Sequence, residues 1–286
     1  MVYGTVFFVE EIVKRLATAS RELQQLKTSA SASPGPVTPA MSPASAIGSS
    51  EDVIKRWFST RKIEVHLDSS LSDTSGFFDD TAVKIGQDYG LFAELIERVR
   101  FAYRKSHTNV VLELGQLSQK DGQAITQLCR WLYEHTFFSR FHYQKVEKIA
   151  RITLQSAPAI RQFFEGSWLE WYALMSAQEV AQTSNKPLQA SARGAKVSFP
   201  NEDLHELDVI CLSADNQPIC IECKSGEFRR DIEKYSRLRK RLDIPRQRFI
   251  VLSPELTQEQ AEGLSSMYEL SFVNLSTLKS HLAGLL

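Results

Sequence analysis

Two apolar segments of the chain contain charged residues, near the start of the first segment and at the end of the second. Residues 205–212 read His-Glu-Leu-Asp-Val-Ile-Cys-Leu, and residues 218–226 read Pro-Ile-Cys-Ile-Glu-Cys-Lys-Ser-Gly. The apolar residues indicate two strands, and the polar residues between the segments indicate a turn. Because charged side chains are costly to place among buried Val, Ile and Leu, we expect Asp208, Glu222 and Lys224 to have a chemical role.

A hairpin would bring these three side chains together. Side chains alternate along a strand, so Glu222 and Lys224 share one face, roughly 6.6 Å apart at ~3.3 Å per residue. Pairing of the strands places Asp208 close to Glu222. Two carboxylates that close repel each other unless a cation lies between them.

The chemistry that this arrangement favours is phosphate chemistry with a metal ion. Mg²⁺ prefers carboxylate oxygens, waters and phosphate oxygens, and the backbone carbonyl of Cys223 would face the same place. A metal-bound water has a lowered pKa and is a better nucleophile. Lys224 would orient that water or neutralise charge on the phosphate in the transition state. The pattern therefore predicts a Mg²⁺ (or Mn²⁺) site.

The bulk composition is that of an ordinary globular protein. The 286 residues include 34 basic and 34 acidic residues, so the formal net charge is zero. This allows one well-packed domain and a smaller one, and it argues against a strongly basic coat protein for nucleic acid. A local basic patch stays compatible with it.

Cysteine usage favours a reducing compartment. Cys220 and Cys223 have the spacing of a zinc or redox pair, but on a strand their side chains point to opposite faces, and no second Cys/His pair has matching spacing. We favour free buried thiols, which suit a cytoplasmic protein. No segment is predicted to span a membrane, and the apolar residues 6–9 precede their charges, unlike those of a secretory signal.

The chain divides into four predicted parts. Residues 1–27 have the period of an amphipathic helix that docks on the body or pairs with another copy of the chain. Residues 28–50 are rich in Ser, Ala and Pro and predict a flexible linker. Residues 51–155 predict a small helical or winged-helix-like module, and residues 156–286 predict the domain that contains the charged hairpin.

Within the small module, helical and extended patterns alternate. Residues 91–99 have a helical period, and residues 109–114 read as a strand. Ser118 is a good N-cap for a helix through Leu132. Residues 137–154 are compatible with one or two strands or with a continued helix.

The C-terminal domain predicts an α/β fold. A helix over residues 157–177 is followed by three strands, and helices then alternate with single strands to the end of the chain. This order predicts a mixed sheet with parallel strands and crossover helices.

Over residues 157–286 the chain resembles the PD-(D/E)xK restriction-endonuclease-like superfamily. The resemblance rests on Asp and Glu-x-Lys on a hairpin that follows a helix bearing a glutamate. More narrowly, Phe-Glu-Gly-Ser-Trp-Leu-Glu at 164–170, Glu-Leu-Asp at 206–208 and Ile-Glu-Cys-Lys-Ser-Gly at 221–226 are similar to the nuclease module of CRISPR-ancillary nucleases, which cyclic oligoadenylates activate.

The resemblance implies a restriction-endonuclease-like mixed sheet flanked by helices and a Mg²⁺-dependent endonuclease. Its substrate would be nucleic acid, with DNA preferred over RNA. Glu170 would be the helix carboxylate, Asp208 and Glu222 the metal ligands, and Lys224 the catalytic lysine. Such nucleases often pair to cut two strands, which is consistent with a homodimer.

A locally basic stretch follows the Glu-x-Lys strand. It predicts a groove for the phosphate backbone, although a plain solvated helix has a similar composition. The expected nucleic-acid contacts are Arg229, Arg230, Lys234, Tyr235 and Arg237.

Several alternatives stay open at this point. Glu170 is equally compatible with a surface salt bridge, and Glu206 with a solvated neighbour of Asp208. His205 replaces the Asn that is more frequent in the motif. Residues 51–155 lack the repeated strand-helix pattern of a nucleotide-sensing domain, so activation by a cyclic nucleotide is not implied. The alternative function is a non-catalytic nucleic-acid-binding or scaffold protein that retains the fold.

Overall fold

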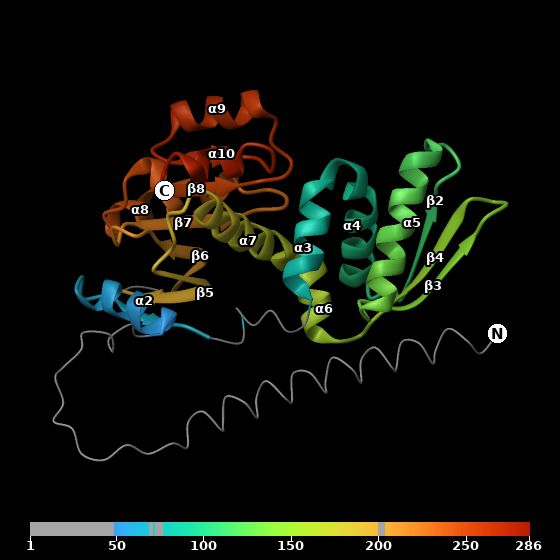
Figure 1. Ribbon diagram of the computed structural model, residues 1–286, viewed down its shortest axis with the longest axis horizontal. Helices are drawn as coiled ribbons and strands as arrows, with labels where there is room; N and C mark the ends of the chain where they lie inside the picture. Colours follow the sequence, from blue (N-terminus) through green and yellow to red (C-terminus); the bar gives the residue numbers. More distant parts are fainter. Residues whose placement is uncertain (1–48, 69–70, 72–76, 200–203) are drawn as a thin grey trace, which may run out of the picture. The chain divides into compact units, whose positions relative to one another are not determined.

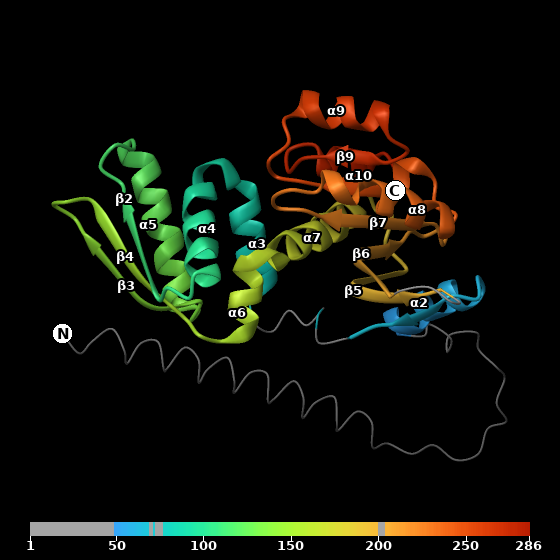
Figure 2. The same ribbon diagram turned by 180° about the vertical axis from the view of Figure 1, so that it is seen from behind.

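The computed structural model describes residues 49–68, 71, 77–199 and 204–286 (Figures 1 and 2). The chain divides into two compact units, residues 1–47 and 48–286, and all described residues belong to the second. The predicted amphipathic helix over 1–27 and nearly all of the predicted linker over 28–50 lie outside the described residues. Among the described residues, no helix has the length and apolar character needed to cross a bilayer.

A six-stranded mixed sheet carries the C-terminal domain. Its strands follow the spatial order β1-β5-β6-β7-β8-β9, antiparallel from β1 to β7 and parallel from β7 to β9. The strands are β1 (Glu64–His66), β5 (Ala190–Ser198), β6 (His205–Leu212), β7 (Pro218–Cys223), β8 (Phe249–Leu252) and β9 (Ser271–Val273). The predicted α/β fold with a mixed sheet is confirmed.

Helices cover both faces of this sheet. They are α2 (Ser50–Ser59), α7 (Trp168–Thr183), α8 (Ile232–Arg241), α9 (Gln258–Met267) and α10 (Leu278–Ala283). The short helix α6 (Pro158–Gln162) precedes α7 and contacts the turn 163–167. One apolar core joins α7 and α10 to the face that carries Cys211 and Ile219. The other core joins α2, α8 and α9 to the face that carries Ile210 and Cys220. This alternation explains why the strands are apolar on both sides.

The small module combines three helices with a three-stranded sheet. Its elements are α3 (Phe78–Gln87), α4 (Tyr89–Arg104), β2 (Asn109–Glu113), α5 (Gln119–Glu134), β3 (Phe138–Gln144) and β4 (Ile149–Leu154). The strand order is β2-β4-β3, all antiparallel. Ser118 caps α5 as expected, since its side chain accepts a hydrogen bond from the backbone of Asp121. The segment 137–154 is a β-hairpin, one of the forms that its sequence allowed.

The start of the chain's described part differs from the predicted division. The small module was expected from residue 51, but α2 packs on β5, and β1 pairs with β5 through Val65 and Val197. Ile54, Trp57 and Phe58 are buried in the second core of the large sheet. Their apolar side chains hold residues 50–66 against a sheet whose other strands lie more than a hundred residues further along the chain.

A close helix contact joins the small module to α7. Gly86 on α3 lies against the ring of Tyr172 on α7, and a Cβ atom at Gly86 would lie 2.7 Å from Cγ of that ring. We predict that Gly86→Ala destabilises the protein by about 1–3 kcal/mol through overpacking, although Ala is the better helix former. Urea unfolding checks this.

Gly90→Ala is the matched control, because a Cβ atom built there would meet no atom within 4 Å apart from its own stretch of helix. It should leave the free energy of unfolding unchanged or raise it slightly. Equal effects of the two substitutions would contradict the proposed close contact.

Candidate functional site

The charged residues of the hairpin lie where two strands separate. The pairing of β6 with β7 runs from Leu212 and Pro218 to Val209 and Ile221. Asp208 and Glu222 are the next residues, beyond the last pair. The sheet therefore opens at the point where both strands carry a carboxylate.

An irregularity in β5 accompanies this opening. Leu207 belongs to one apolar core and Val209 to the other, although regular alternation would place both on one face. In the register of the two strands, Gly194 lies opposite Asp208, between the paired residues on either side. Gly194 has a φ of +59°, a conformation that glycine adopts without steric cost. The side chains of β6 therefore change from one face of the sheet to the other at Asp208.

Lys224 links the two carboxylates. Its Nζ lies 3.2 Å from Oδ2 of Asp208 and 3.7 Å from Oε2 of Glu222. The backbone N–H of Cys223 donates to the same Asp208 oxygen, at 2.7 Å. The structure thus brings together the three residues that the hairpin pattern singled out.

Glu222 is the most deeply placed member of this group. Its side chain is only 3% exposed, and its Oε1 is buried without a hydrogen-bond partner among the described residues. Burial raises the pKa of Glu222 well above its usual range; Asp208 raises it further, and Lys224 and Lys234 act in the opposite direction. An orphaned buried acceptor is costly, so this oxygen has the environment of an unfilled ligand position.

The ammonium group of Lys224 is held in its charged form. Burial alone would lower the pKa of Lys224, but Asp208 and Glu222 raise it more, and the net shift is upward. On another side, the ring of Tyr235 lies 5.6 Å from Nζ. Lys224 is therefore a fixed positive charge between two carboxylates.

Glu170 is paired within the protein. Its Oε2 accepts a hydrogen bond from Nη1 of Arg193 at 3.0 Å, and Arg193 is 4% exposed. The Arg193 guanidinium also lies 3.9 Å above the ring of Trp171. The pKa of Glu170 is raised to about 7, mainly by burial and then by the negative charge of Asp208. Arg193 lowers this pKa, and Glu206 raises it. Glu170 thus interacts electrostatically with the hairpin carboxylates while Arg193 holds it.

The helix that carries Glu170 is broken before it. The continuous helix expected over 157–177 is wrong, because a π-helical turn, Phe163–Ser167, separates α6 from α7. The break is at Gly166, whose backbone is non-helical. A Cβ atom there would lie 3.9 Å from Oγ of Ser225, in the loop that follows Lys224. The break therefore lies beside the site.

The small module contacts the same loop. Nη2 of Arg100, on α4, donates to the carbonyl of Ser225 at 2.9 Å, and Arg100 also pairs with Glu97. Gly226, which follows, has a φ of +118°. The interaction fixes the backbone immediately after Lys224.

Sequence reasoning missed both arginines of the site. Arg193 is the only charged residue among the small residues Ala-Ser-Ala-Arg-Gly-Ala at 190–195, and a lone cation in such a strand is a usable signal. Arg100 lies in an ordinary charged helix, so its role has no local signature.

The residues predicted to contact nucleic acid fall into two groups. Arg229, Arg230, Lys234 and Arg237 are exposed, and Arg229 pairs with Glu227 at 3.1 Å. Tyr235 differs from the expectation, because it is buried in the core beneath α8. Its ring lies beside Lys224, in the interior of the protein.

The donor set for a cation is small. Within the described part of the chain, no group of three or more His, Cys, Asp or Glu side chains is placed to hold a metal ion. Asp208 and Glu222 supply two carboxylates, so a cation here needs main-chain, water or substrate oxygens as well. Mg²⁺ is usually bound in this manner, by one or two carboxylates with several waters and phosphates.

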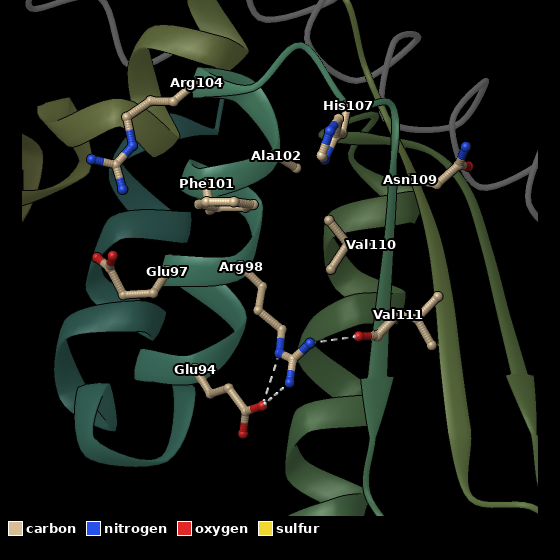
Figure 3. Close-up of a pocket in the computed structure, with 10 residues that line it drawn as sticks. All are labelled: Glu94, Glu97, Arg98, Phe101, Ala102, Arg104, His107, Asn109, Val110 and Val111. Atoms are coloured by element: carbon tan, nitrogen blue, oxygen red, sulfur yellow. Dashed lines mark hydrogen bonds and ion pairs between the residues drawn. The ribbon is translucent and has the colours of Figure 1, made fainter.

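A hollow on the small module is chemically different. It lies between α4 and β2 and includes Phe101 and Val111 (Figure 3). Arg98 pairs there with Glu94 at 2.8 Å and donates to the carbonyl of Val111. Because Glu94 and Glu97 both line the hollow beside its basic residues, we assign no anion site to it.

Comparison with known proteins gives structural likeness only. No protein-family model matches the sequence, and no curated protein matches it. Protein VC1899 from Vibrio cholerae is similar in structure, with a TM-score of 0.53 and 18% identity over 81% of this chain and 60% of that one. Can2 from Sulfobacillus thermosulfidooxidans, solved in complex with cyclic tetra-adenylate, has a TM-score of 0.56 and 16% identity over 81% of this chain and 59% of that one.

The chain thus spans about six-tenths of the length of these structures. At these identities the likeness shows a shared fold, and it agrees with the mixed sheet flanked by helices.

Glu170 should leave a signature in the pH dependence of stability. Its pKa rises from 4.5 to about 7 on folding, so the folded chain binds the proton more tightly. The resulting stabilisation is fully present below pH 4.5 and is lost as the pH rises through 7. Between pH 4.5 and pH 8, the free energy of unfolding of the wild type should therefore decrease more than that of Glu170→Gln, which has no group to titrate there. The difference should reach roughly 3 kcal/mol. Urea unfolding in EDTA measures it.

Glu165→Gln is the control, because it removes a carboxylate that pairs with Arg161 at the protein surface. It should keep the wild-type pH profile. If the Glu170→Gln profile also ran parallel to that of the wild type, the environment assigned to Glu170 would be wrong.

Proposed function

We propose that this chain is a metal-dependent nuclease that hydrolyses phosphodiester bonds of nucleic acid, with DNA preferred over RNA. The observation that carries the proposal is the convergence of Asp208, Glu222 and Lys224 where the hairpin strands separate, with a buried Glu222 oxygen left without a partner. Two carboxylates and a fixed ammonium suit the binding of a divalent cation beside a phosphate.

The residues present fit Mg²⁺ or Mn²⁺. Asp208 and the orphaned oxygen of Glu222 would hold the ion, with the main-chain carbonyl of Cys223 as the proposed third protein ligand. When bound, such an ion lowers the pKa of a coordinated water and supplies the nucleophile.

The protein groups around this place have distinct tasks. Lys224 would place positive charge next to the phosphate that gains negative charge in the transition state. Arg193 would keep Glu170 in place beside the carboxylate pair. The exposed basic residues at the start of α8 and before it (Arg229, Arg230, Lys234 and Arg237) would hold the phosphate backbone.

The choice of nucleic acid as substrate rests on the motif resemblance and on the fold shared with Can2 and VC1899. Can2 was solved with cyclic tetra-adenylate, itself made of nucleotides. We do not propose that a nucleotide activates this chain. The described part of residues 51–155 forms the small module and one strand of the large sheet, and not a repeated strand-helix domain of the nucleotide-sensing kind.

Substitution of the proposed ligand and lysine tests the function directly. Asp208→Asn and Lys224→Met should each lower cleavage by at least ~10²-fold, the scale for loss of one charge-stabilising group. Cleavage of plasmid, linear DNA and RNA is measured with Mg²⁺, Mn²⁺ or EDTA, and EDTA should abolish it.

Glu179→Gln, which changes an exposed carboxylate that pairs with Lys279 away from the site, is the control and should cleave normally. Cleavage that survives both site substitutions would place the chemistry elsewhere. Nucleic-acid binding without cleavage by the wild type would favour the scaffold alternative.

Glu222 should show opposite effects on stability and metal response. Because burial disfavours its charged form, Glu222→Gln should raise the melting temperature in EDTA at pH 8, by several degrees for a gain of about 1 kcal/mol. Mg²⁺ should raise the melting temperature of the wild type and leave that of the variant unchanged. Equal responses to Mg²⁺ would exclude Glu222 as a ligand.

A further inference from the structure

Helix α5 and the β3–β4 hairpin border a second hollow on the small module. The two elements lie side by side in both ribbon views (Figures 1 and 2). The hollow has a volume of about 780 Å³, and its walls are residues of α5, of the loop before it and of the hairpin end. It belongs to elements that carry none of the proposed catalytic residues.

One face of α5 is a row of unpartnered amides. Gln119, Gln123 and Gln127 follow each other at intervals of four residues, which places them on one side of a helix. All three are exposed and line the hollow. Within the described residues, none of their side chains has a hydrogen-bond partner. The opposite face of α5 carries the buried residues that pack in the core, such as Leu128 and Leu132.

The hairpin end adds positive charge. Lys145 and Lys148 flank the turn, and Arg130 extends the polar face of α5; all three are exposed and line the hollow. Their side chains have no ion-pair partner in the part of the chain that the structure describes. No acidic residue lines the hollow. Nearby Asp121 is bonded to Ser118 at the helix cap, and Glu147, in the turn between the two lysines, is exposed and lies outside the lining. The chain has zero net charge, so this cluster is a local feature.

We propose that this hollow is a docking site for duplex DNA, with α5 in the major groove and the hairpin lysines on the phosphate backbone. The major groove of B-form DNA admits one α-helix, and glutamine amides can pair with the edge of adenine. Unpaired lysines at a hairpin end match phosphates in charge. The major groove of A-form RNA is too deep and narrow for side chains to read, which favours DNA.

The contrast with the α4–β2 hollow supports the assignment. There two carboxylates, Glu94 and Glu97, line the hollow together with the basic residues, and Arg98 is paired with Glu94, whereas the lining of the hollow beside α5 has basic residues and no acidic ones. This site would hold the duplex near the chain without taking part in cleavage. It goes beyond the proposed nuclease function and can be tested without it.

Binding to a 30-base-pair DNA duplex is measured in EDTA by fluorescence anisotropy, with the full chain and over a range of salt. Lys145→Gln with Lys148→Gln should weaken binding by about tenfold or more. The plot of log K against log salt has a negative slope, and its magnitude should decrease by about 2, because each removed ammonium group would leave one phosphate with its counterions. The control is Lys62→Gln with Lys105→Gln, two exposed lysines outside the hollow. Lys62 shares the positive φ of Lys148, so backbone strain is matched.

A second pair of variants tests the helix face. Gln123→Glu adds one negative charge inside the hollow and should weaken DNA binding several-fold. Gln87→Glu adds the same charge at an exposed helix end outside the hollow and should not. Urea unfolding confirms that each variant is folded.

Three results would overturn the proposal: no duplex binding by the wild type, wild-type affinity and salt slope in the double lysine variant, or duplex RNA bound as tightly as duplex DNA. Cleavage is assayed separately with Mg²⁺. If the wild type binds DNA through the hollow but never cleaves, the nuclease function fails and the docking site stands. If cleavage persists while the lysine variants bind normally, the docking site alone fails.

Discussion

The buried carboxylate of Glu222 is the constraint on which the rest of the site depends. An isolated ionised carboxylate in an apolar sheet would be strongly destabilising, and here the surrounding structure compensates only in part. Lys224 pairs with Oε2 of Glu222, and Lys224 and Lys234 both lower its pKa, yet Oε1 has no hydrogen-bond partner among the described residues. Such incomplete satisfaction in an otherwise well-packed sheet is typical of places where a ligand completes the structure.

The sheet is irregular where this carboxylate needs space. The last β6–β7 pair precedes Asp208 and Glu222, and the positive φ of Gly194 accompanies the change of face at Asp208. A regular ladder would continue the pairing and set the two carboxylates directly across from each other without Lys224 between them. The backbone N–H of Cys223, which donates to Asp208, shows that the open strand end serves as a donor to the site.

The sequence allowed the hairpin and its three charged residues to be predicted, because alternation and strand pairing are local rules. Asp208, Glu222 and Lys224 come together as their spacing indicates. The partners that come from distant elements could not be inferred in this way. Arg193 reaches Glu170 across 23 residues and Arg100 reaches Ser225 across 125, and no periodicity indicates such pairs. Residues 51–66 were assigned to the small module for the same reason, although they pack on the large sheet. Their apolar side chains are compatible with either core, and only the pairing of β1 with β5 places them.

The hydrogen bond between Arg100 and Ser225 joins the small module to the C-terminal domain next to the proposed catalytic lysine. Ser225 directly follows Lys224, and its carbonyl accepts a hydrogen bond from Arg100, whose side chain is 17% exposed and also pairs with Glu97. A shift of α4 would therefore be felt by the loop that positions the lysine. In the same module, α5 packs on the sheet of which β3 and β4 are part, so DNA held against α5 would lie on a body that touches the proposed catalytic loop. Docking and cleavage are thus proposed for separate surfaces joined by one short path of direct contacts, which is the physical requirement for coupling between two sites.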